Sequence, residues 1–465
     1  MKKLRSYIKI ITVVSAITAL TACKKQLDLK PHDQIDATDA ITTDKDVQSN
    51  LIGAYNRAGL SYIYGGDVFL MPDLMASQSV VKWNGTFQDL TQMVNQKLTI
   101  NNGYVDNYWL DAYRVNNQAN YVLANLDKAT AANKDTYEGQ AKFLRGLMYF
   151  DMARLFGKSW NDGDPNVNLA VPIVLKPTTV IGADSYPSRS TVAQVYAQAI
   201  SDLITAKAKL QGVESKVDDF NPTFFANSYS AGAILARIYL QQGQYKKAAA
   251  EADTVIQSGK YSLVTNYADE FPFPNQNAVH VDNTTEDVFA IQVTAQQGVN
   301  DLNTFYASSD YGGRGDISLR ATFLDEFEEG DGRLAVYNED SGGSLQVDKF
   351  DNLYGNVRVI RLAELYLIRA EANFRLNTST GAAPVDDINV IRARAGLTAL
   401  SSVVLVDILK ERRLELAFEG GFFLHDAKRL QQNVGALPYN SSRLVFPIPR
   451  DEMNANKNLK QNDGY

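Results

Sequence analysis

Two glutamates in the last quarter of the chain have the spacing of a catalytic carboxylate pair. Glu411 and Glu415 are four residues apart, so they share one face of a predicted helix. Two carboxyl groups can hydrolyse a glycoside when one acts as the acid and the other as nucleophile or base. However, Arg412, Arg413 and Glu419 lie beside them and favour a compensated lattice of ion pairs between packed helices. We therefore predict a structural role for these residues and expect no catalytic residue, with hydrolysis as the less favoured alternative.

Other residue types that carry chemistry are scattered along the chain. His32, His280 and His425 do not have the spacing of metal ligands, and no nucleophile elbow occurs. The segment Gly312-Gly313-x-Gly315 is too short for a dinucleotide-binding loop and does not lie between a strand and a helix. We expect no metal ion and no cofactor.

Two long segments instead combine aromatic rings with amide, acidic and basic side chains. Such a mixture suits a ligand that presents hydroxyl groups in one direction and an apolar face in another. The first segment contains Tyr62, Tyr64, Asp67, Trp83, Asn84 and Phe87, and the second contains Phe271, Phe273, Tyr306, Asp310, Tyr311 and Arg314. The candidate binding residues selected from them are Tyr62, Trp83, Asn84, Tyr306, Tyr311 and Arg314. Trp83 with Asn84 is the preferred pair, and the alternative is that Trp83 plugs its loop onto the body of the protein.

The composition is that of a globular protein. The chain has 465 residues, of which 45% are hydrophobic and 21% charged, so it is not a mainly disordered, collagenous or polytopic membrane protein. Its formal charge of −7 argues against nucleic-acid binding, which usually requires a basic surplus. The single cysteine excludes an intrachain disulfide.

The first residues have the features of an export signal. Lys2, Lys3 and Arg5 precede an apolar stretch over 10–20 that is too short to span a bilayer. The sequence Leu20-Thr21-Ala22-Cys23 that follows looks like a bacterial lipobox. We predict a signal peptide over 1–22, lipidation of Cys23 and a polar tether over 23–43; the alternative is a soluble secreted protein with a chance cysteine at this position.

Hydrophobic periodicity predicts a mainly α-helical body. Helices are predicted over 46–58, 108–127, 137–156, 191–210, 225–242, 245–258, 359–376, 385–395, 403–419 and 423–432. Strands are predicted over 288–293, 348–350 and 443–446, and long irregular stretches over 61–104, 157–190 and 260–357. Because binding residues concentrate on loops that a rigid scaffold holds, these stretches are candidate ligand-binding loops.

One window has the spacing of a tetratricopeptide hairpin. Small, aromatic and glycine residues alternate there at the required offsets, as Ala236, Tyr239, Gly243, Tyr245 and Ala248. The alanines allow close approach of two antiparallel helices, and the glycine permits the turn between them. Weaker copies begin at Gly146-x-x-Tyr149 and Ala370-x-x-Asn373, so the sequence predicts several stacked hairpins, about four.

Several motifs in a fixed order resemble the SusD/RagB family of outer-membrane nutrient-binding lipoproteins. They are the lipobox, Trp109-x-x-x-Tyr113 with Asn120, the segments 141–157, 231–256, 361–372, 388–397 and 411–420, and the terminus from Phe446 to Tyr465. The chain departs from the family pattern after Gly420, where the usual arginine is missing and Gly421 follows. An ion pair of that arginine is therefore in doubt, although Asp426 and Arg429 are present.

The resemblance implies a tetratricopeptide-like scaffold in two regions, 44–260 and 261–465, with long ligand-binding loops on the side opposite the repeats. It also implies a lipoprotein of the outer membrane, facing the cell exterior, that captures oligosaccharide and passes it to a TonB-dependent SusC-like barrel. The alternatives are the same role with peptide ligands, as in RagB-type members, and a periplasm-facing location. A scaffold without small ligands would instead have short loops and no aromatic pocket.

Overall fold

The structure is a computed structural model that describes residues 41–182, 185–212, 224–274, 278–296 and 298–465. The predicted signal peptide, Cys23 and most of the predicted tether lie outside the described residues. No helix in the described ranges is long and apolar enough to cross a membrane.

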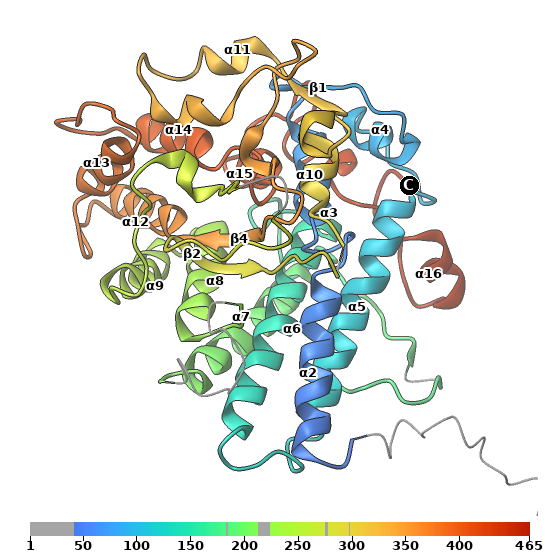
Figure 1. Cartoon of the computed structure of the whole chain (residues 1–465). Coiled ribbons are helices and arrows are strands. Elements are labelled where there is room, and N and C mark those ends of the chain that lie inside the picture. Colours follow the sequence, from blue (N-terminus) through green and yellow to red (C-terminus); the bar gives the residue numbers. More distant parts are fainter. Residues whose placement is uncertain (1–40, 183–184, 213–223, 275–277, 297) are drawn as a thin grey trace, which may run out of the picture.

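The described chain is mainly helical, with only a few short strands, as predicted (Figure 1). The N-terminal helices are α2 (Asp44–Ala58), α3 (Asp67–Ala76), α4 (Gln88–Val94), α5 (Gly103–Ala124), α6 (Lys134–Phe156), α7 (Val192–Lys209), α8 (Ser228–Gln241) and α9 (Tyr245–Gln257). The later ones are α10 (Asp301–Tyr306), α11 (Ala321–Leu324), α12 (Leu362–Leu376), α13 (Pro384–Arg394), α14 (Leu405–Glu415), α15 (Phe422–Arg429) and α16 (Arg450–Ala455). The short strands are β1 (Val81–Trp83), β2 (Asp287–Ile291), β3 (Ile317–Leu319) and β4 (Val357–Arg361).

Each of the ten predicted helices is present, with boundaries that differ by a few residues. Their apolar stripes are buried; in α2, for example, Val47, Leu51 and Ala54 face the core. Local capping fixes several starts. At α7 the hydroxyl of Thr191 accepts the backbone N–H of Gln194 at 3.2 Å, and the Gln194 side chain accepts that of Thr191 at 2.9 Å.

The hairpin of α8 and α9 confirms the tetratricopeptide spacing. Ala236 and Ala248 are fully buried between the two helices. Gly243 forms the turn with φ +69°, in the left-handed region that favours glycine. Tyr239 packs beside this turn with 5% exposure. These residues therefore act as the repeat pattern predicts.

The two weaker repeats also begin hairpins. A Cβ on Gly146 of α6 would lie 3.0 Å from the carbonyl oxygen of Ala199 in α7, so these helices pack too closely for a side chain at that position. The third hairpin, α12 and α13, turns at Asn377, which has φ +51°. Helix α7 packs on α8, and α9 packs on α12, so the three hairpins form one continuous stack.

The stretch 61–104 is less irregular than predicted. It contains α3, which is buried on nearly all sides, together with β1 and α4. Helix α3 lies against α15, and Gly421 at the start of α15 makes this approach possible. A Cβ there would lie 2.4 Å from Cγ of Pro72, and Gly421 has φ +69°. The glycine that follows Gly420 is thus explained by the close packing of α15 on α3.

The strand predictions were partly right. The stretch 288–293 corresponds to β2, which pairs antiparallel with β4, a strand that the sequence did not indicate. The predicted strands 348–350 and 443–446 were wrong, because Asp348–Phe350 and Ser442–Leu444 form 3₁₀ turns. Both segments are short and connect other elements, so apolar residues alone did not distinguish strand from turn.

The expected lattice of ion pairs is present between β4, α13 and α14. Its buried cations are Arg333, Arg361, Arg392 and Arg394, and its acids are Glu286, Glu328, Asp331, Glu411, Glu415 and Glu419. Glu411 is 4% exposed and Glu415 0%. Burial would raise the pKa of Glu415, but the charges of Arg394, Arg361 and Arg333 outweigh burial and hold it below the ordinary value. Glu411 and Glu415 therefore line no open cleft, and their ion pairs hold the packed helices together.

The ion pairs of Asp426 are complete, although the arginine that the resemblance leads one to expect after Gly420 is missing. Asp426 accepts a hydrogen bond from Nε of Arg412 at 2.7 Å and another from Nε of Arg429 at 2.6 Å. Arg429 in turn binds Glu371 through both terminal nitrogens, at 2.7 and 2.8 Å. Asp426 is therefore paired with two arginines, Arg412 and Arg429, without the arginine that is missing after Gly420.

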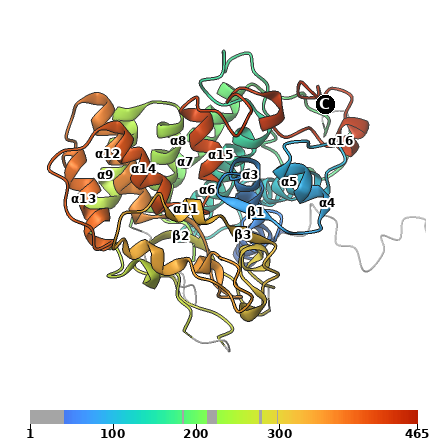
Figure 2. The ribbon, with the colours of Figure 1, turned by 90° about the horizontal axis from the view of Figure 1, so that it is seen from above.

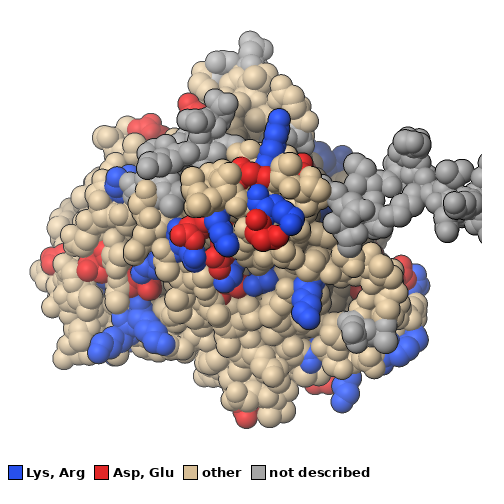
Figure 3. Space-filling view, turned by 90° about the horizontal axis from the view of Figure 1, so that it is seen from below, with Lys and Arg blue, Asp and Glu red and all other residues tan. Residues whose placement is uncertain are grey.

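Charges on the surface are mixed in sign. On the face seen in Figure 3, Lys and Arg side chains lie beside Asp and Glu side chains, without a broad patch of one sign. Lys209 of α7, for example, lies 2.6 Å from Asp135 and 3.1 Å from Glu138 of α6. This face therefore offers no extended basic surface for a polyanion.

The segment after α15 returns to the N-terminal helices and is pinned there by one guanidinium. Arg189 is 7% exposed, and its hydrogen-bond acceptors are the backbone oxygens of Phe156, Leu169, Ala170 and Lys460 and the side-chain oxygen of Asn462. The backbone N–H of Phe446 also donates to the carbonyl of Leu155 at 2.8 Å. Residues 446–462 are thus part of the N-terminal packing.

Candidate ligand-binding site

The two predicted loop segments meet in a small antiparallel sheet. Strand β1 pairs with β3, with Val81 opposite Leu319 and Trp83 opposite Ile317. Figure 2 places these strands side by side near the middle of the view from above. Just beyond β1, the backbone N–H of Asn84 donates to the carbonyl of Asp316 at 2.7 Å. The pairing therefore brings Trp83 and Asn84 next to the segment that carries Arg314.

Aromatic, amide and charged groups gather at this end of the sheet. We call Trp83, Asn84, Phe87, Arg314 and Asp316 the β1–β3 cluster. The Arg314 guanidinium carbon lies 4.9 Å from the centre of the Phe87 ring, and its Nε donates to Asp316 at 2.8 Å. Phe87 is 39% exposed, and the Arg314 side chain is 46% exposed. The cluster thus offers an apolar ring and a guanidinium to solvent, while Asp316, which is 7% exposed, holds that guanidinium in place.

Trp83 is anchored as well as partly exposed. Its indole N–H donates to the hydroxyl of Thr91 at 2.9 Å, and its ring lies 6.4 Å from that of Phe305. A Cβ on Gly85 would lie 2.4 Å from the Trp83 ring, so only glycine lets the chain fold over the ring edge. The side chain is half-buried. Trp83 thus packs its loop onto the body of the protein, and its role in ligand binding stays a prediction.

Asn84 keeps hydrogen-bonding capacity for a ligand. It is exposed, and its Nδ2 donates to the hydroxyl of Ser318 at 3.0 Å. The side-chain carbonyl and the second amide hydrogen are outside this bond. An exposed amide beside an indole can bind a hydroxyl group while the ring contacts an apolar face.

A second exposed aromatic pair joins Tyr311, on the segment between α10 and β3, to Phe273, which precedes β2 in the chain. The rings of Tyr311 and Phe273 are edge to face, 5.3 Å apart, and each side chain is 37% exposed. The charge of Asp351 raises the pKa of Tyr311, so a carboxylate lies close to this ring. A Cβ on Gly313 would lie 2.1 Å from the carbonyl oxygen of Ala307, so the turn that carries Tyr311 packs tightly on the end of α10.

The remaining selected residues lie elsewhere. Tyr62 is half-buried and packs edge to face on Tyr104 of α5 at 5.9 Å. Tyr306 is 1% exposed, and its ring packs between those of Phe350 and Phe418. We therefore leave Tyr306 out of the site, because its position on α10 faces the core.

Three other residues of the two aromatic segments are also core residues. Tyr64 is 0% exposed, Asp67 2% and Phe271 8%. Sequence reasoning did not select Phe87, Asp316 or Thr91, which complete the β1–β3 cluster or anchor it. Only Phe87 had a usable signal, an aromatic ring close to Trp83 in the sequence; the others depend on a pairing between distant segments.

Comparisons with known proteins identify the family. A family described as "Starch-binding associating with outer membrane" matches residues 25–240, and the SusD family matches residues 345–432. A SusD-like protein of Bacteroides ovatus is 26% identical over 90% of this chain and 82% of its own length. The starch-binding protein SusD of Bacteroides thetaiotaomicron is 23% identical over 75% of this chain and 76% of its own.

Solved structures agree with this match. A putative sugar-binding protein of Bacteroides vulgatus superposes with a TM-score of 0.79 at 26% identity, over 92% of this chain and 99% of that one. A SusD superfamily protein of Bacteroides thetaiotaomicron gives a TM-score of 0.76 at 26% identity, over 90% and 99%. The chain belongs to the SusD/RagB family, whose members are associated with the outer membrane.

Proposed function

We propose that this protein is a cell-surface lipoprotein that captures oligosaccharide through the β1–β3 cluster and passes it to a TonB-dependent SusC-like transporter. The cluster combines what a saccharide needs: an aromatic surface for its C–H face, and an amide and a guanidinium for its hydroxyl groups. The pairing of β1 with β3 carries the proposal, since it joins Trp83 and Asn84 to Arg314 and Asp316. Relatives described as starch-binding and sugar-binding support this ligand class.

In this proposal no bond is made or broken. The carboxylates with catalytic spacing, Glu411 and Glu415, are buried among arginines and cannot meet a glycosidic bond. The protein would bind its ligand, close over the barrel like a hinged lid, and release the ligand into the transporter. A lipid on Cys23 would hold it at the outer membrane, facing outward.

Calorimetric titration of the protein without residues 1–23 tests the binding step. The panel contains neutral oligosaccharides and oligopeptides. We expect saccharide binding, weakened at least about tenfold by Trp83→Ala, because a buried or half-buried aromatic anchor commonly contributes more than about 1.4 kcal/mol. Trp160→Ala is the matched control, since Trp160 is also half-buried but lies on Tyr196 of α7, away from the cluster.

Each result of this titration has a distinct meaning. Peptide binding without saccharide binding would contradict the saccharide assignment and favour the peptide-binding branch of the family. Equal losses of saccharide affinity in Trp83→Ala and Trp160→Ala would contradict the location of the site.

Anchoring and transfer need a test in cells. Cys23→Ser should abolish incorporation of a labelled fatty acid and release the protein from the membrane fraction. Purification of the intact lipoprotein from outer membranes should recover a SusC-like barrel in stoichiometric amount. Protection of the wild-type protein from externally added protease in intact cells would contradict the outward-facing location.

A further inference from the structure

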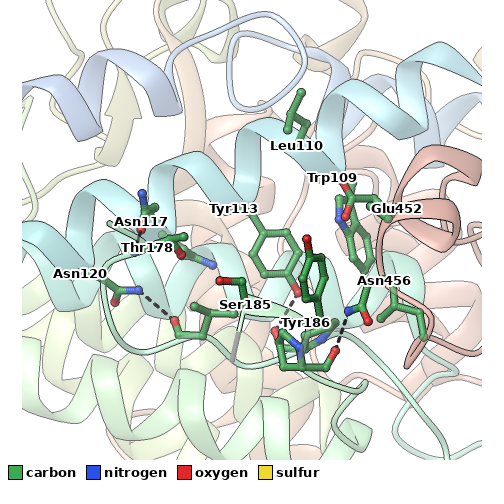
Figure 4. Close-up of a pocket in the computed structure, with 16 residues that line it drawn as sticks. Trp109, Leu110, Tyr113, Asn117, Asn120, Thr178, Ser185, Tyr186, Glu452 and Asn456 are labelled. Atoms are coloured by element: carbon green, nitrogen blue, oxygen red, sulfur yellow. Dashed lines mark hydrogen bonds between the residues drawn. The ribbon is translucent and has the colours of Figure 1, made fainter. Parts of the chain in front are cut away.

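A cavity of about 210 Å³ lies apart from the β1–β3 cluster, between α5, the segments 172–182 and 185–187, and α16 (Figure 4). None of the cluster residues lines it. The three walls come from distant parts of the chain, and residues 446–462 supply one of them. Its volume is below the roughly 300–1,000 Å³ of pockets for drug-sized ligands, so it suits a smaller one.

The walls of this cavity are fixed by hydrogen bonds. The hydroxyl of Tyr113 donates to the carbonyl of Pro172 at 2.7 Å, and Nδ2 of Asn120 donates to that of Val174 at 2.9 Å. On the other side, Nδ2 of Asn456 donates to the carbonyl of Pro187 at 2.8 Å. Helix α5 and the end of α16 thus hold Pro172, Val174 and Pro187 in place. The cavity is preformed, which lowers the entropic cost of binding.

Aromatic rings cover part of the wall. Figure 4 shows the rings of Trp109, Tyr113 and Tyr186 gathered between α5 and the segments 172–182 and 185–187. The centres of the Trp109 and Tyr113 rings are 5.1 Å apart, and Tyr186 is 37% exposed at the rim. Such rings favour the C–H face of a sugar ring.

An amide in the wall has no partner in the described structure. Asn116 lines the cavity with 1% exposure, and neither Oδ1 nor Nδ2 makes a hydrogen bond among the described residues. Leaving one such buried group unsatisfied costs about 1–3 kcal/mol. A ligand with hydroxyl groups, which both donate and accept, would satisfy both ends of the amide.

Among the described residues that line the cavity, the charge is negative. Glu452 of α16 accepts a hydrogen bond from the Trp109 indole, and no lysine or arginine is among these described residues. Burial raises the pKa of Glu452, and Asp106 and Asp451 nearby add to this shift. The Glu452 carboxylate would repel an acidic ligand, whereas sugar hydroxyls can donate to it.

We infer that this cavity is a second saccharide site, which takes one pyranose ring without an acidic group. The ring would lie against Trp109 and Tyr186, with hydroxyl groups on Asn116 and Glu452. The ring can come from a free monosaccharide or from the terminal unit of an oligosaccharide. The site goes beyond the proposed transport function, since it does not depend on the β1–β3 cluster.

Ligand-observed NMR titration of the protein without residues 1–23 tests this site. The probes are glucose, galactose, mannose, xylose and glucuronate. We expect at least one neutral sugar to bind and glucuronate not to bind. Asn116→Ala should weaken that binding at least tenfold without lowering the melting temperature, because this substitution removes no hydrogen bond of the folded protein. Glu452→Gln should reduce the discrimination against glucuronate.

Trp83→Ala separates this site from the proposed capture site. It should leave monosaccharide binding unchanged while it weakens oligosaccharide binding. An oligosaccharide that shows a second binding step, lost in Asn116→Ala, would identify a terminal sugar unit as the ligand; a signal from monosaccharides alone would identify free sugar. The inference is overturned if no neutral monosaccharide binds the wild-type protein, or if Asn116→Ala binds it as the wild type does.

Discussion

Replacing the carboxylate of Glu415 by an amide should strongly destabilise the protein. Glu415 lies at the centre of the buried ion-pair lattice, where its Oε1 accepts hydrogen bonds from Arg361 at 2.6 Å and from Arg394. Its Oε2 lies 3.8 Å from Arg333. Glu415→Gln keeps the shape of the side chain, removes the charge and replaces one acceptor oxygen by an NH₂ donor. Three buried guanidinium groups then lose a shared counter-ion.

The magnitude follows from what remains of the lattice. Removing one partner of a buried ion pair costs about 3–5 kcal/mol, because the other charge stays buried without compensation. Arg361 and Arg394 also bind Glu286, at 2.6 and 2.7 Å, so part of their charge stays compensated. We therefore expect a loss near the lower end, about 3 kcal/mol in the free energy of unfolding.

A half-exposed pair provides the control. Arg413 and Glu326 form a two-pronged pair at 2.7 and 3.0 Å, with side-chain exposures of 36% and 35%. Because water screens such pairs, Glu326→Gln should cost no more than about 1 kcal/mol. Urea unfolding at pH 7, followed by tryptophan fluorescence, measures both variants, and their m-values should match that of the wild type.

The pH dependence offers a second check on the same residue. The folded-state pKa of Glu415 lies below its ordinary value, so the stabilisation is complete above that ordinary value and is lost as the pH falls through the folded-state pKa. The difference in unfolding free energy between the wild type and Glu415→Gln should therefore persist at neutral pH and shrink in acid. A loss of unfolding free energy at pH 7 no larger than that of Glu326→Gln would refute the stabilising role of Glu415.

Three further substitutions give separate tests of the structure. Burial raises the pKa of Asp351 to about 8, so the folded protein holds this proton at a pH where the unfolded chain has lost it. The free energy of unfolding therefore falls as the pH rises from about 4 to 8. Asp351→Asn should then raise the melting temperature more at pH 8 than at pH 4, and an equal shift at both would contradict this. Gly313→Ala places a Cβ 2.1 Å from the Ala307 carbonyl oxygen, so it should displace the turn that carries Arg314 and weaken saccharide binding in the calorimeter; unchanged affinity would argue against a role for that turn. Thr191→Ala removes the cap of α7 and should cost about 1 kcal/mol in urea unfolding, whereas an unchanged midpoint would mean that the cap hydrogen bond adds nothing.

The scaffold could be predicted from the sequence because its signals are local. The offsets of Ala236, Gly243 and Ala248 specify a helical hairpin without knowledge of any other segment. The apolar periodicity of the long helices works in the same way. Helix α3 escaped detection, since it is apolar on nearly every face and contains Pro72, so it has no amphipathic period.

The candidate site could be predicted only in part, because its geometry depends on distant residues. Sequence reasoning selected Trp83, Asn84 and Arg314 by type, and the structure gathers them. The three-residue strands that do so are too short to have a period, and nothing local indicates that Trp83 lies opposite Ile317. Tyr306 has the same residue type as Tyr311, yet its place on α10 turns it into the core.

The hydrogen bonds of Arg189 affect the order in which parts of the protein can fold. Residues 446–462 are synthesised after every element that they hold together, so the packing around α5 and α6 must wait for them. Until they arrive, a guanidinium meant for the interior lacks two of its acceptors, the Lys460 carbonyl and the Asn462 side chain. Loss of this segment by proteolysis would undo packing at residues made hundreds of positions earlier, together with the α16 wall of the second cavity.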